Sequence, residues 1–211
     1  MEQPSLDGDR SERYAVVLGE IRVRFDEIAS FGPWDWRATE IAALHARKII
    51  ELIVYGSLMN NQDAVAEIAI AFRKRDAANA RGILQEVNPR YWPEPCERLE
   101  VNPGQYSLNP LEDGFLREQD WGKAYGFLSD ILHARSPFKP PLVLNDEAAR
   151  VQELLTETWT LLSHHWIHLP EDDQALAAIL RTPEGGVQVV PFQKPDGPSP
   201  GTGASGEAAG T

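Results

Sequence analysis

The sequence predicts a mainly α-helical protein: a bundle of about five to six helices, a short C-terminal β-hairpin and a disordered tail. Three observations lead to this fold class. Apolar residues recur at spacings of three and four over most of the chain, which is the period of one helix face. After Pro170 the period changes to two, around a loop that contains glycine. From Gln193 onward the chain is rich in Pro, Gly, Ser and Ala and has few apolar residues.

The first half of the chain predicts four helices, at about 11–30, 35–59, 63–74 and 76–87. The clearest is 35–59, where Asp35 is placed to cap the first free amides of the helix. Its apolar surface is broad and is formed by Ile41, Leu44, Ile49, Leu52, Ile53 and Tyr55.

The segment 88–117 is predicted to be an ordered surface insertion in the helical domain. Five prolines prevent a long helix here, and the segment also carries two tyrosines and a tryptophan, which are unusual in a disordered linker. Short extended pieces are expected at 99–101 and 105–108, on either side of a turn at 102–104.

Two more helices are predicted at about 117–134 and 146–168, the second capped by Asn145 or Asp146. The hairpin is expected at about 175–192, with a turn at 183–186. We therefore expect one helical domain over 11–192 and a disordered tail over 193–211.

Composition restricts the compartment and the partners. The net charge of −12 disfavours broad binding to nucleic acid or to an anionic membrane. The single cysteine, Cys96, allows no disulfide within the chain. The N-terminus has no signal-peptide pattern, and the longest apolar stretch, 49–58, is too short to span a bilayer. A soluble cytoplasmic protein is expected.

The first candidate site is polar and lies on two predicted helices. Tyr125, Ser129 and His133 are spaced by four residues, so they stack along one side of a helix. Arg47 and Glu51 are one turn apart among isoleucines and leucines, so they must pair or reach solvent. One interpretation is a groove in which all five face each other and His133 is an acid–base group. The alternative is a helix-capping histidine and an exposed ion pair.

The second candidate site is a metal site at His164 and His168. These two histidines are four residues apart, which is the spacing of two metal ligands on one helix. The glutamate that a metalloprotease motif requires after the first histidine is replaced by His165, and no third ligand follows from spacing. The alternative is a histidine-rich last turn favoured by the helix dipole. No phosphate loop, dinucleotide-binding turn or nucleophile elbow is present, so no cofactor is expected.

The string that runs from Tyr125 to Phe138, with Leu-Ser and Leu-His-Ala followed by Ser-Pro-Phe, resembles the later helix of HEPN-type helical proteins. These are bacterial all-α domains that include toxin and phage-defence ribonucleases. The resemblance covers 35–60 and 117–168 and implies a helix-packed homodimer. The nucleases of that superfamily carry an arginine a short interval before the histidine, and no arginine lies at that distance before His133.

Three functions follow from these patterns. The chain itself favours a non-catalytic interaction module that binds a protein partner through its helical surface or its hairpin, and the expected partner is a second copy or another protein. The resemblance implies RNA cleavage, with His133 as the acid–base group and Arg47 or Arg135 holding phosphate. The third is a metal-dependent enzyme that uses His164 and His168.

Overall fold

A computed structural model describes residues 6–58, 62–74, 76–102, 105–133, 143–169 and 174–193. It confirms the predicted fold class: the described residues form six helices and an antiparallel sheet, to which the C-terminal hairpin belongs. The helices are α1 (Leu6–Ala29), α2 (Trp36–Ser57), α3 (Gln62–Lys74), α4 (Ala77–Val87), α5 (Trp121–Leu132) and α6 (Leu144–Ser163). The strands are β1 (Glu94–Asn102), β2 (Gln105–Pro110), β3 (His164–His168), β4 (Gln174–Ile179) and β5 (Gln188–Gln193).

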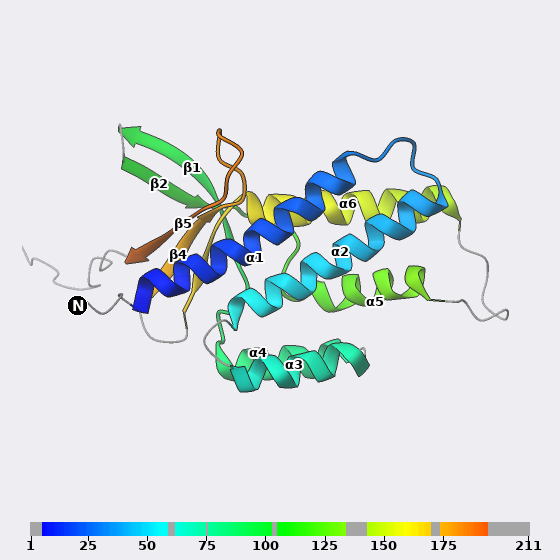
Figure 1. The fold of residues 1–211 in the computed structure, drawn as a ribbon, viewed down its shortest axis with the longest axis horizontal. Helices are drawn as coiled ribbons and strands as arrows, with labels where there is room; N and C mark the ends of the chain where they lie inside the picture. Colours follow the sequence, from blue (N-terminus) through cyan, green and yellow to red (C-terminus); the bar gives the residue numbers. More distant parts are fainter. Residues whose placement is uncertain are drawn as a thin grey trace, which may run out of the picture.

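The central element of the bundle is α2, which contacts α1, α5 and α6. Figure 1 shows the sheet at one end of this bundle and the α3–α4 pair alongside it, on the side away from α1. Asp35 caps α2 as predicted, because its side chain accepts a hydrogen bond from the Ala38 amide at 2.8 Å. The core-facing side of α2 is fully buried at Ala42, Ala43, Ile49, Ile50 and Val54.

The predicted hairpin, β4–β5, is part of a larger sheet. Five antiparallel strands are arranged in the order β2-β1-β3-β4-β5. The two extended pieces expected in the insertion are β1 and β2, and β3 lies between β1 and the hairpin. Gln193, expected to begin the tail, is the last residue of β5, and the rest of the predicted tail lies outside the described residues.

The prediction of a helix that continues to His168 is wrong for its last five residues. The helix ends at Ser163, and His164–His168 is β3. In this strand His165 and Ile167 are buried and the other three residues are half-buried, the alternation that a strand with one core-facing side requires. The backbone of β3 is hydrogen-bonded to β1 and β4. These partners are distant in sequence, so the local sequence does not indicate the strand.

The start of α6 also differs from the prediction. Val143 occupies the N-cap position, without a side-chain hydrogen bond, and the helix begins at Leu144. Asp146 and Glu147 lie in the first turn, where negative charge interacts favourably with the helix dipole.

A buried hydrogen bond ties α1 to the sheet. The Tyr14 hydroxyl lies 2.7 Å from Nε2 of His165, and Nδ1 of His165 lies 3.0 Å from the Leu162 carbonyl. Because a carbonyl only accepts, Nδ1 carries the proton, and Nε2 accepts from Tyr14. Gly56 permits this packing, since a Cβ there would lie 2.9 Å from Cε2 of Tyr14.

Candidate functional site

Three of the five residues of the predicted polar site meet between α2 and α5. The Arg47 guanidinium donates to the Tyr125 hydroxyl at 2.7 Å, and that hydroxyl donates to Oε1 of Glu51 at 3.1 Å. Arg47 also pairs with Glu51 at 3.3 Å along α2. Lys48 contacts the other carboxylate oxygen of Glu51 at 3.0 Å. The carboxylate is therefore neutralised by two cations and hydrogen-bonded by a phenol.

The surroundings of Tyr125 are those of a packed core side chain. Its ring stacks on Phe72 with centroids 5.1 Å apart, and the Arg47 guanidinium lies over the Tyr125 ring, 4.7 Å from its centroid. Burial, followed by the charge of Glu51, raises the pKa of Tyr125 to about 12. The phenol therefore stays protonated at neutral pH and acts as a hydrogen-bond donor.

The other two predicted site residues do not join this network. The Ser129 hydroxyl donates to the backbone carbonyl of Tyr125 at 2.8 Å, within α5. His133 is exposed at the C-cap of α5, two helical turns beyond Tyr125, which corresponds to roughly 12 Å along the axis. The structure thus brings Arg47, Glu51 and Tyr125 together and leaves His133 apart. The catalytic role of His133 stays a prediction.

The network predicts a specific cost for losing one hydroxyl. Tyr125→Phe removes the hydroxyl that accepts from Arg47 and donates to Glu51 in a partly buried network, and the Arg47–Glu51 ion pair remains. We expect the free energy of unfolding to fall by about 1–3 kcal/mol. Ser129→Ala is the matched control, since its hydroxyl bonds only to a helix carbonyl. Urea denaturation of both variants measures the difference. Equal losses would show that the network contributes nothing particular to stability.

The proposed metal ligands His164 and His168 are not on a helix. In β3, residues four apart are separated by about 13 Å, too far for two ligands of one ion. Among the described residues, no group of three His, Cys, Asp or Glu side chains is arranged to hold a metal. His168 instead contacts Glu94, with Nε2 3.2 Å from Oε2.

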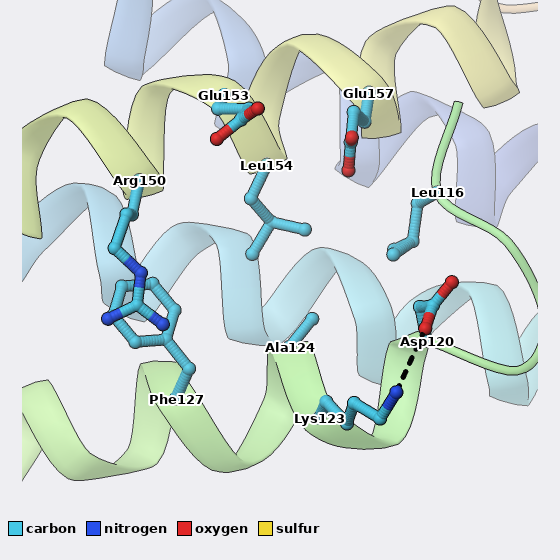
Figure 2. A pocket seen from close by; sticks show the side chains of 9 residues that line it. All are labelled: Leu116, Asp120, Lys123, Ala124, Phe127, Arg150, Glu153, Leu154 and Glu157. Atoms are coloured by element: carbon cyan, nitrogen blue, oxygen red, sulfur yellow. Dashed lines mark hydrogen bonds and ion pairs between the residues drawn. The ribbon is translucent and has the colours of Figure 1, made fainter. Parts of the chain in front are cut away.

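A small hollow of about 310 Å³ lies between α5 and α6, and Figure 2 shows its lining. Arg150 covers the Phe127 ring at 3.9 Å from its centroid, and Lys123 reaches toward Asp120 at 3.4 Å. Burial, then the charges of Glu153 and Asp120, raises the pKa of Glu157, which also borders the hollow.

A larger groove of about 500 Å³ lies where the insertion meets the end of α4, and this volume is in the usual range for ligand sites. Two segments form it: residues 85–95, from the last turn of α4 into β1, and residues 110–118, from the end of β2 toward α5. We call it the insertion groove. Its lining consists of Gln85, Pro89, Arg90, Trp92, Pro93, Glu94, Pro95, Pro110, Leu111, Phe115, Arg117 and Glu118.

A chain of buried hydrogen bonds fixes the floor of the insertion groove. The Trp121 indole donates to the Tyr91 hydroxyl at 2.9 Å, and this hydroxyl donates to Glu118 at 2.6 Å. Arg81 of α4 donates to both oxygens of the same carboxylate, through Nε and Nη2. The Trp92 ring stacks on Trp121, with the planes 11° apart, and its indole donates to the Leu116 carbonyl. The groove is therefore preformed by the core beneath it.

The charged side chains of the groove are mostly paired. Arg90 pairs with Glu94 at 2.9 Å. The hydrogen bond from His168, with others from Arg90 and Trp166, lowers the pKa of Glu94 to about 2 against the opposing effect of burial. Within the described part of the chain, Arg117 pairs with no carboxylate. It donates to the Glu112 carbonyl and lies 5.8 Å from the Phe115 ring centroid.

The sequence predicts an ordered insertion at 88–117 and indicates no role for it. The sequence feature that could have indicated a binding site is the combination of prolines with aromatic and arginine side chains in this segment, at Trp92, Phe115, Arg90 and Arg117. These residues come from two segments separated by a strand pair, so no spacing rule links them.

Comparisons with known proteins give no relative. No family model matches the chain, and no match was found among curated proteins or among solved structures. No helix in the described ranges has the length and apolar character needed to cross a membrane.

Proposed function

We propose that this protein is a non-catalytic interaction module that binds an extended, proline-containing segment of a protein partner in the insertion groove. The observation that carries the proposal is the lining of the groove, in which four of twelve residues are proline and two, Trp92 and Phe115, are aromatic.

Proline walls determine the form of ligand that suits the groove. A strand added to a sheet edge needs backbone N–H donors, and proline has none. A polyproline II segment needs no ladder of donors, because its backbone makes no regular hydrogen bonds, and aromatic grooves bind such segments in several recognition domains. The donors that this ligand does require, for its carbonyl oxygens, are present at Arg90, Arg117 and Gln85.

The arrangement of the polar site supports a binding role over catalysis. Arg47, Glu51 and Tyr125 satisfy each other, and Ser129 bonds to its own helix. The competing proposal, HEPN-like RNA cleavage, requires His133 to act from an exposed helix end about two turns away. It predicts RNA cleavage that disappears in His133→Ala, and the binding proposal predicts that purified protein leaves RNA intact.

The groove itself is tested with a displayed library of short peptides. Selection against the wild type is expected to enrich extended, proline-containing sequences. The selected peptide should lose roughly tenfold in affinity for Arg117→Glu, because a donor at the rim becomes a repelling carboxylate, a change of about 1.4 kcal/mol. Fluorescence anisotropy measures the affinities.

The matched control is Arg150→Glu, the same charge reversal at an exposed arginine that borders the other hollow. It should bind the selected peptide as the wild type does. Failure to enrich any sequence, or equal losses in the two variants, would contradict binding in the insertion groove.

A further inference from the structure

The chain carries a segment with the chemistry that the insertion groove suits. After Gln193 the sequence continues Lys194-Pro195-Asp196-Gly197-Pro198-Ser199-Pro200. Alternating prolines favour the polyproline II conformation and remove backbone N–H groups. The carbonyl oxygens of such a segment remain available to accept from arginine side chains at the groove rim.

The sheet register places the start of this segment near the groove. Glu94, Trp166, Ala177 and Val190 are paired in one row across four strands, so three strand spacings, roughly 14 Å, separate Glu94 from β5. Gln193 lies three residues beyond Val190, or roughly 10 Å along the strand.

The part of the insertion groove that precedes β1 extends from that row in the direction in which β5 runs. Because β1/β3, β3/β4 and β4/β5 are all antiparallel pairs, β1 and β5 run in opposite directions. The residues that precede Glu94, including Pro93 and Pro89 of the groove, therefore lie on the side toward which β5 ends. Gln193 and the groove are thus separated by at most roughly 20 Å, and the seven residues from Lys194 to Pro200 span about 22 Å in a polyproline II conformation.

We propose that Pro198-Ser199-Pro200 of the chain occupies its own insertion groove and competes with the partner segment. This inference rests on the proposed function, since it takes the groove to be a peptide site. The module is then self-inhibited: a partner must displace a tethered ligand whose effective concentration, with so few connecting residues, is on the order of millimolar. Removing the tethered ligand should increase the affinity for any peptide added in solution.

The test uses the full chain and a labelled synthetic peptide with the sequence of residues 194–203. Its affinity is measured for the wild type and for the double variant Pro198→Glu, Pro200→Glu. We expect the double variant to bind the peptide roughly tenfold more tightly, because its own segment no longer competes at millimolar effective concentration. The control Thr202→Glu, Ser205→Glu adds the same charge outside the proline motif and should bind as the wild type does.

Each other outcome is informative. Equal affinities for the wild type and the Pro198, Pro200 double variant would overturn self-occupancy and leave the groove as a site for partner peptides. No binding of this peptide to either protein would overturn Pro198–Pro200 as the ligand, while the library selection tests the groove separately. A wild type that becomes dimeric with rising concentration, when the double variant stays monomeric in light scattering, would show that a second copy supplies the segment, which also contradicts self-occupancy.

Discussion

Replacing Trp121 by alanine is expected to lower the free energy of unfolding by about 3–5 kcal/mol, the range for removing a large aromatic side chain from a core. Trp121 is 0% exposed. Its ring stacks on Trp92, and its N–H donates to Tyr91, so the substitution removes the support of the insertion groove as well as buried area. Urea denaturation followed by circular dichroism measures the loss.

Trp36→Ala is the matched control for this prediction. Trp36 is 38% exposed at the start of α2, and its removal should cost less than about 1 kcal/mol. A loss at Trp121 no larger than that at Trp36 would mean that the tryptophan is not packed as described.

The second large effect is expected on acidification between about pH 6.5 and pH 4. Burial, partly offset by the hydrogen bond to the Leu162 carbonyl, lowers the pKa of His165 from 6.5 to about 4. In this window the unfolded chain binds a proton at this residue and the folded chain does not. The free energy of unfolding therefore decreases as the pH is lowered. The shift corresponds to about 3 kcal/mol lost by pH 4, since one pKa unit is about 1.4 kcal/mol.

His165→Gln separates this effect from the titration of carboxylates. Glutamine is neutral at all pH values, and its side-chain amide oxygen replaces the ring nitrogen as an acceptor for the Tyr14 hydroxyl. The variant should therefore lose less stability than the wild type from pH 6.5 to pH 4. His133→Gln, at an exposed position, should leave the wild-type dependence unchanged. An NMR titration that gives His165 a pKa close to 6.5 would contradict the buried Tyr14–His165 contact.

The periodic helices could be predicted from the sequence, and the histidine-rich segment could not. The apolar stripe and the capping residue Asp35 identify α2 because helix geometry is local. His164–His168 fits both a helix end and a half-buried strand. Its strand state depends on pairing with β1 and β4, which are remote in sequence.

The contacts of the candidate sites could also be predicted where they are local in sequence, and not where they depend on remote segments. The contact of Arg47 and Glu51 follows from their spacing on one helix, and Tyr125 was expected to face them. His133 lies beyond the reach of that network because it is the C-cap residue of α5, about two helical turns past Tyr125. The insertion groove was not predicted, since its two walls are brought together by the β1–β2 pair and by the Tyr91–Glu118–Arg81 contacts.

The most direct test of the groove as a binding site is an NMR titration of the full-length protein with the library-selected peptide, followed at the tryptophan indole N–H signals. Trp92 lines the groove, and Trp159 packs against Phe25 of α1 at a ring distance of 5.1 Å, outside the groove lining. We predict that the Trp92 signal shifts in proportion to bound peptide and that the Trp159 signal stays in place. A shift at Trp159 with an unchanged Trp92 signal would contradict the account, because the peptide would then bind elsewhere.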